Sequence, residues 1–130
     1  MKYLKISALA IAFCAMYASC RYDKADELYV TTGCDTTAAV TFSGFVNGVV
    51  DQNCLNCHGN LNNTTLGASI NLEGYDNLIA YVNDGPNGGS FMGAITHSPN
   101  NVAMPQGASQ LDACTILKLQ KWVNNGAQNN

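Results

Sequence analysis

Apolar residues recur at helical spacing in three segments of the chain. In residues 42–50 the apolar positions fall on one helical face: Phe42, Phe45, Val46, Val49 and Val50. Ser43 is a candidate N-cap of this segment. Residues 75–82 and residues from about 112 to 124 repeat the pattern, and each ends at a glycine-containing turn. Because no run of strand length alternates between apolar and polar residues, the pattern predicts an all-α domain with long loops.

The N-terminal residues 1–19 have the pattern of a secretory signal peptide. Two lysines precede an apolar run that is too short to span a bilayer, and the small residues Ala18 and Ser19 follow, directly before Cys20. This arrangement resembles the lipobox of bacterial lipoproteins, although Tyr17 replaces the usual aliphatic residue. The resemblance implies cleavage before Cys20 and acylation of that cysteine. The alternative is an ordinary secretory signal followed by an incidental cysteine.

The rest of the chain divides into a short tether and one domain. Residues 20–33 are mostly polar and lack helical periodicity, which predicts a flexible tether behind the acylated cysteine. Residues 34–130 form the predicted globular domain. Charged residues make up only 12 % of the chain, about half of the usual share of roughly 25 %. After residues 1–19 are removed, nine acidic and four basic residues leave a net charge of −5, which argues against a nucleic-acid partner.

The motif with the clearest chemistry is Cys54-Leu55-Asn56-Cys57-His58, the Cys-x-x-Cys-His pattern of covalent haem c attachment. Two thiols three positions apart can both form thioether bonds with the vinyl groups of one porphyrin, and His58 is then delivered to the iron. A thioredoxin-type redox pair would need a βαβ context, which the pattern lacks. A zinc site would need a second Cys or His pair at ligand spacing, and the sequence has none. The motif therefore predicts one haem c, and hence one iron, per chain.

Further residues extend the haem motif into a family resemblance. With the later Met104-Pro105 pair and a final helix that contains Trp122, residues 34–130 resemble a small single-haem class I cytochrome c domain of a bacterial envelope lipoprotein. The resemblance implies three to five short helices wrapped around one covalently bound haem, with the first and last helices crossing. Gly44 and Gly48 would suit a close crossing opposite Trp122.

The resemblance also implies the two iron ligands, His58 on the proximal side and Met104 on the distal side. Met104 lies in a loop rich in Gly, Pro and Asn, where a methionine is poorly explained as a core residue, and Pro105 stiffens the chain beside it. Met92 is better explained by packing. His97 is the rival distal ligand, because the attachment motif does not fix the sixth ligand. Its alternative role is to bond the backbone or a haem propionate.

The other four cysteines fit this assignment. Cys14 belongs to the signal peptide and Cys20 to the lipid anchor, which leaves Cys34 at the start of the domain and Cys114 on the last helix. A disulfide between Cys34 and Cys114 is expected in an oxidising envelope. The alternative is two free buried thiols.

The predicted function follows from the coordination. With His58 and Met104 both on the iron no position is open to substrate, and the thioether favours Fe(II). The chain is therefore expected to be a membrane-tethered one-electron carrier in the bacterial cell envelope, on the periplasmic side or the outer-membrane surface. It would exchange electrons with redox protein partners and would not be an enzyme. The alternatives are a haem-based gas or redox sensor and a non-catalytic relay subunit of an oxidoreductase.

Overall fold

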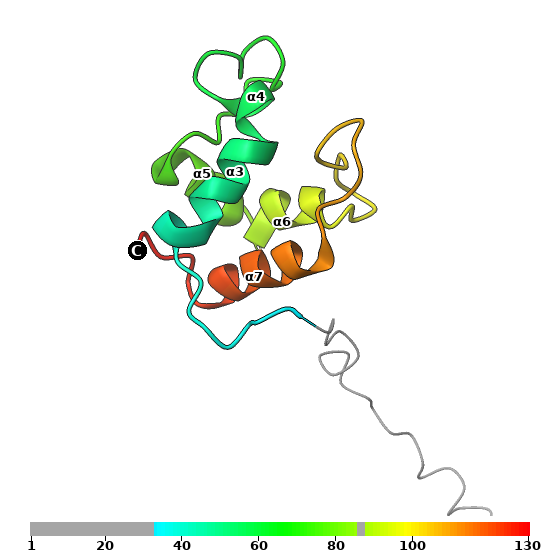
Figure 1. Cartoon of the computed structure of the whole chain (residues 1–130). Helices are drawn as coiled ribbons and strands as arrows, with labels where there is room; N and C mark the ends of the chain where they lie inside the picture. Colours follow the sequence, from blue (N-terminus) through cyan, green and yellow to red (C-terminus); the bar gives the residue numbers. More distant parts are fainter. Residues whose placement is uncertain (1–32, 86–87) are drawn as a thin grey trace, which may run out of the picture. The chain divides into compact units, whose positions relative to one another are not determined.

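Helices form all the regular structure of the part of the chain that the computed structural model describes, residues 33–85 and 88–130. These residues belong to a compact unit, Thr31–Asn130. The order of elements is a π-helix, η1 (Phe42–Val46), then α3 (Asn47–Asn53), α4 (Leu55–His58), α5 (Tyr75–Val82), α6 (Gly89–Ile95) and α7 (Ala113–Asn124) (Figure 1). The all-α prediction is confirmed for the described residues. The predicted signal peptide, Cys20 and almost all of the tether lie outside them.

The first predicted helix is observed as η1 followed directly by α3. Its N-cap is Thr41, whose side chain accepts a hydrogen bond from the Gly44 N–H at 3.1 Å, so the prediction of Ser43 as the cap is wrong. Asn130, the last residue, binds the start of the same helix. The Phe42 N–H donates to the Asn130 Oδ1 at 2.9 Å, and the Ser43 N–H donates to the Asn130 main-chain oxygen at 2.8 Å. The chain end thus satisfies N–H groups that a helix start leaves without partners.

The core lies between η1, α3, α5, α6 and α7. Its most deeply buried side chains are Val46, Leu78, Leu119 and Trp122. Met92 on α6 is also buried, which agrees with its prediction as a packing residue. No helix among the residues described here is both long enough and apolar enough to cross a membrane.

An aromatic side chain, and not a glycine, makes the contact between the first and last helical segments. The Phe42 ring lies 6.2 Å from the Trp122 ring, centroid to centroid, and meets Tyr75 edge to face at 5.3 Å. A Cβ atom at Gly48 would meet nothing within 4 Å, and one at Gly44 would meet only the Thr41 side chain that caps its own helix. The expectation that Gly44 or Gly48 lies opposite Trp122 is therefore wrong.

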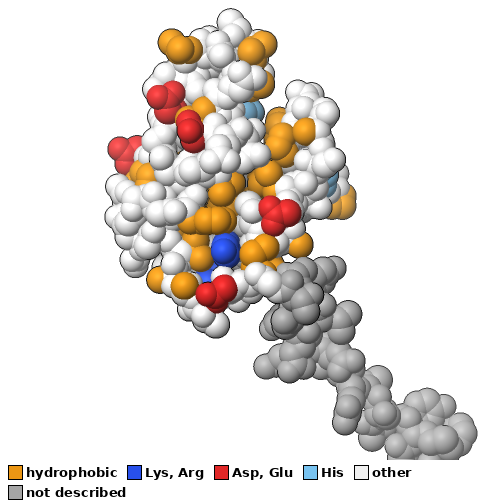
Figure 2. Space-filling view, in the orientation of Figure 1, with side chains coloured by type: hydrophobic (Ala, Val, Ile, Leu, Met, Phe, Trp, Pro, Cys, Tyr) orange, Lys and Arg blue, Asp and Glu red, His pale blue; other side chains and the backbone are white. Residues whose placement is uncertain are grey.

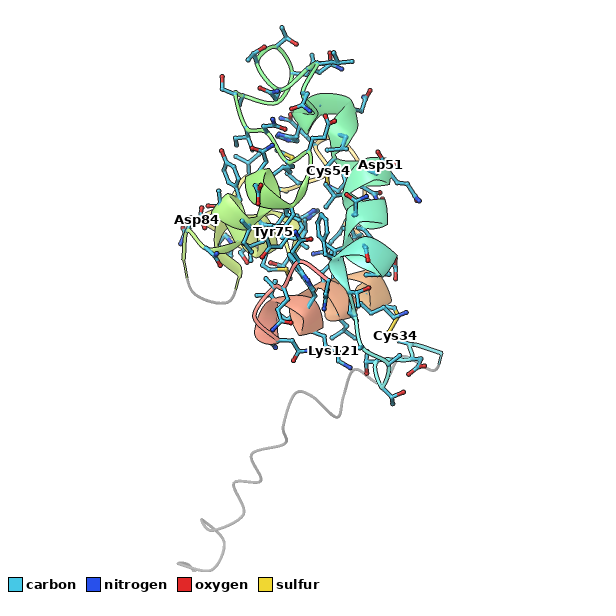
Figure 3. The ribbon with its side chains drawn as sticks, turned by 90° about the vertical axis from the view of Figure 1, so that its left-hand side faces the viewer. Cys34, Asp51, Cys54, Tyr75, Asp84 and Lys121 are labelled. Carbon is cyan, nitrogen blue, oxygen red and sulfur yellow. A yellow bond between two sulfur atoms is a disulfide. The ribbon has the colours of Figure 1, made fainter. Side chains whose placement is uncertain are left out.

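Residues 34–40, here called the strap, are fastened to α7. Cys34 and Cys114 form a disulfide with 5.4 Å between their Cα atoms, which is the pairing that the sequence predicts. Lys121 donates from Nζ to the carbonyl oxygens of Thr36 and Ala38, the latter at 2.9 Å. Figure 3 shows Cys34 and Lys121 at one end of the domain and Cys54 toward the other.

Candidate functional site

The Cys-x-x-Cys-His residues begin at the break between α3 and α4. α3 ends at Asn53, and Cys54 takes a φ of −123°, outside the helical range, before α4 begins at Leu55. The Cys57 and His58 N–H groups both donate to the Cys54 carbonyl, at 3.1 and 2.8 Å. These bonds close one tight turn, so the two cysteines and the histidine of the motif are held in a single local structure. Cys54, at the start of this turn, is labelled in Figure 3.

Both motif cysteines are free thiols. Cys54 and Cys57 are each half-buried and are not bonded to each other or to another cysteine of the described chain. Burial raises the pKa of the Cys54 thiol to about 11. Cys54 is therefore protonated at neutral pH, and the sulfur atoms of both residues are available for another bond.

The His58 ring is oriented by a backbone carbonyl. His58 is the one buried polar or charged side chain within 33–85 and 88–130, and its Nδ1 lies 3.1 Å from the Ile70 carbonyl oxygen. A carbonyl can only accept, so Nδ1 carries a proton and donates it to the Ile70 oxygen. Nε2 has no hydrogen-bond partner among the described residues. Every fully buried side-chain nitrogen of the described residues has a partner, so the unpartnered Nε2 is in contact with solvent. The bond to Ile70 fixes the orientation of the ring, and Nε2 is the ring nitrogen that has no partner in the described chain.

An asparagine-rich loop, residues 59–71, fixes the carbonyl that orients His58. The side chains of Asn62 and Asn63 donate to the carbonyls of Asn56 and Gly59, both at 2.9 Å, and the Leu72 N–H donates to the His58 carbonyl at 2.8 Å. The backbone of this loop therefore closes on the turn of the motif, and it delivers the Ile70 carbonyl to the histidine ring.

Two further residues of this region were not predicted from the sequence. A Cβ atom at Gly67 would lie 2.5 Å from the Cys57 carbonyl oxygen, so only glycine fits at this contact between the loop and the motif. Glu73 accepts a hydrogen bond from the Asn60 N–H at 2.6 Å. The chain's 16 asparagines were the available signal for such a loop, since asparagine side chains readily bond nearby backbone groups.

The two candidates for the distal ligand lie in one loop, between α6 and α7, and are bonded to each other. Met104 is half-buried, and its N–H donates to the Ala94 carbonyl at 3.1 Å. His97 is exposed, and its Nε2 lies 3.1 Å from the Met104 carbonyl oxygen. Because that oxygen can only accept, His97 Nε2 carries a proton and donates it.

The loop that carries Met104 and the lobe formed by α3 and α4 flank a hollow in the molecule. In Figure 2 this hollow is bordered by hydrophobic side chains, and histidine atoms are visible on each of the two lobes. A separate groove between η1, α3 and the start of α7 contains none of the predicted ligands.

The donor set fits haem c. Two free thiols stand three positions apart, and the next residue is His58, whose Nε2 has no partner in the described chain. In the same residues no three His, Cys, Asp or Glu side chains gather as a site for a bare metal ion. Comparison of the chain with protein-family models, curated proteins and solved structures gives no match.

Proposed function

We propose that residues 34–130 are a cytochrome c domain that carries single electrons while tethered to a bacterial envelope membrane. The observation that carries this proposal is the state of His58. Its Nδ1 is bonded to the Ile70 carbonyl, and its Nε2 has no partner among the described residues, beside two free thiols. Cys20, as the acylated residue, and the signal peptide complete the proposal from the sequence.

Each residue of the motif has a role in the proposed site. Cys54 and Cys57 would hold the porphyrin through thioether bonds, and His58 would bind the iron through Nε2. When bound, haem c supplies an iron that alternates between Fe(III) and Fe(II). The chain itself orients the histidine through Ile70, and hydrophobic side chains border the hollow between the two lobes.

Met104 is the better candidate for the sixth ligand. Its side chain is half-buried, whereas His97 is exposed and already uses Nε2 to bond the Met104 carbonyl. A thioether on the iron stabilises Fe(II) and leaves no position open to substrate. Both effects suit an electron carrier that is not an enzyme. A gas sensor would instead need Met104 to leave the iron.

The experiment that tests this proposal is extraction of haem from the purified holoprotein. Thioether bonds survive denaturation and acid-acetone treatment, so we expect all haem to stay with the protein. Cys54→Ser and Cys57→Ser should each sharply reduce haem retention, whereas Met92→Leu, a core change of similar volume, should not. Complete extraction of haem from the wild type would refute the proposal. Ready binding of carbon monoxide at neutral pH by the wild type would favour the sensor.

A further inference from the structure

The loop that joins α6 to α7 is fastened along its length to the end of α6. The Ser98 N–H donates to the Gly93 carbonyl at 2.9 Å, and the Gln110 side chain donates to the Ile95 carbonyl at 3.3 Å. The Asn101 side chain packs on Gly93 so closely that a Cβ atom there would lie 2.4 Å from its Nδ2. These contacts fix both ends and the middle of the loop.

Within this loop, both backbone hydrogen-bonding groups of Met104 are held. Its N–H donates to the Ala94 carbonyl at 3.1 Å, and its carbonyl accepts from His97 Nε2 at 3.1 Å. His97 reaches across the loop from a backbone with a φ of +55°, which disfavours most side chains. Asparagine and histidine are among the non-glycine residues that tolerate it best.

We propose that His97 is a positioning residue for Met104. Its hydrogen bond holds the Met104 backbone where the thioether binds the haem iron, and so sets how readily an external ligand displaces that thioether. The proposal rests on the function proposed above. The physical reason is that a ligand held in place before it binds loses less conformational freedom on binding. Without the bond, Met104 binds the iron less tightly. The apparent affinity of a competing ligand for the iron then rises by the factor by which Met104 binding is weakened.

The variants that test this role separate the hydrogen bond from the backbone conformation. His97→Asn keeps a residue that tolerates positive φ, but its side chain is too short to reach the Met104 carbonyl. His97→Gln restores an N–H donor of similar reach. Lys121→Met is the matched control, because Lys121 lies on α7, donates to the strap and makes no hydrogen bond to the Met104 loop.

The measurement is the equilibrium titration of each oxidised holoprotein with cyanide. It is followed at the weak near-red charge-transfer band that a methionine sulfur bound to the iron gives and that is lost when cyanide replaces it. We expect His97→Asn to bind cyanide about three- to tenfold more tightly than the wild type, the range that one net hydrogen bond supplies. His97→Gln should return the affinity to near the wild-type value. Lys121→Met should lower the melting temperature without changing the cyanide affinity.

Each failure has a distinct outcome. If the wild type retains thioether haem and shows the band, but His97→Asn binds cyanide as the wild type does, only the positioning role is overturned. It is also overturned if His97→Gln fails to restore the affinity, or if Lys121→Met changes it equally. If the wild type lacks the band and His97→Asn opens the iron to cyanide, His97 is itself the ligand and the positioning role is wrong. If the wild type holds no covalent haem, the proposed function falls.

Discussion

The Cys54 thiol has the most perturbed acid-base chemistry of the described residues. Because burial raises its pKa to about 11, its thiolate fraction at neutral pH is about 100-fold below that of an ordinary cysteine. In the haem-free protein with the Cys34–Cys114 bond intact, we expect iodoacetamide to alkylate Cys54 far more slowly in the folded state than in urea. Peptide mass spectrometry over time measures both rates. Equal rates in the two states would show that the thiol is not buried.

The same residue has a consequence for stability. A group whose pKa is raised in the folded state loses its stabilising contribution as the pH rises from its ordinary value, 9.0, towards the folded value of about 11. The haem-free wild type should therefore become easier to unfold in that interval, and Cys54→Ala should lose less stability over it.

At the level of single residues, the sequence predicts side-chain chemistry better than backbone partners. Cys54, Cys57 and His58 were singled out from their spacing, because a porphyrin would need two thiols and a histidine at these positions. The Ile70 carbonyl that orients His58 could not be predicted, since a backbone oxygen has no signature in the sequence. The bond from His97 to Met104 depends on the path of the loop, which residue types alone do not fix.

Among the helices, α7 has the best-defined start. Asp112 accepts hydrogen bonds from the Thr115 N–H at 2.9 Å and from the Thr115 hydroxyl. Both bonds hold the pKa of Asp112 below its usual value, and the bond from the hydroxyl has the larger effect. We expect Asp112→Ala to lower the free energy of unfolding by about 0.5–2 kcal/mol at neutral pH. Asp112→Asn is the matched control, because asparagine is an equally good N-cap, and it should cost much less. Urea unfolding measures the three proteins.

The direction of the pH dependence follows from the lowered pKa. The contribution of Asp112 is complete above its ordinary pKa of 3.8 and is lost as the pH falls through the lower folded value. The difference in stability between the wild type and Asp112→Ala should therefore shrink in acid. A difference that stays constant from neutral pH down to about 2 would show that the carboxylate does not act as the cap.

The helices that the sequence predicted are those with strong periodicity and clear ends. α5 and α7 lie where the pattern placed them, and residues 42–50 are helical. α6 was not predicted, because it is one of the short helices and contains Gly89 and Gly93, which weaken the local preference for helix. The cap was misassigned to Ser43 because Thr41, two residues earlier, is an equally suitable side chain.

For the molecule as a whole, the strap ties the start of the domain to its last helix. The Cys34–Cys114 bond spans 80 residues, for which loop-closure entropy gives about 4–5 kcal/mol of stabilisation as an upper limit. We expect the double change Cys34→Ser with Cys114→Ser to lower the melting temperature by several degrees, and Lys121→Met to lower it less. Calorimetry of the holoproteins measures both. Alkylation of Cys34 and Cys114 in the native, non-reduced protein would contradict the bond.

Charge is distributed unevenly along the chain, and this affects how electrons would be exchanged. Residues 52–72, which contain the haem motif and its asparagine-rich loop, include no Asp, Glu, Lys or Arg, and neither do residues 85–111, which contain His97 and Met104. The net charge of −5 expected for the mature chain therefore resides on other segments. Two carboxylates nevertheless lie against these segments, because Glu73 accepts from the Asn60 N–H and Asp84 accepts from the Ser90 N–H, both at 2.6 Å. Exposed charges farther away than the Debye length, about 10 Å at 0.1 M salt, are largely screened.

We therefore expect rates of electron exchange with small inorganic complexes to depend less on ionic strength than the full net charge of −5 would give. Reduction of a trivalent anion, ferricyanide, and of a trivalent cation, tris-phenanthroline cobalt(III), should both show shallower slopes against salt than a net charge of −5 would give. Val102 is exposed on the Met104 loop, so Val102→Lys should add a positive charge there and steepen the two slopes in opposite directions. Ala80→Lys, an exposed position on α5 outside both loops, is the control and should change them less. The wild-type rates could instead depend steeply on salt, with slopes of opposite sign for the two complexes that match the net charge. That result would show that electrons leave through a charged part of the surface.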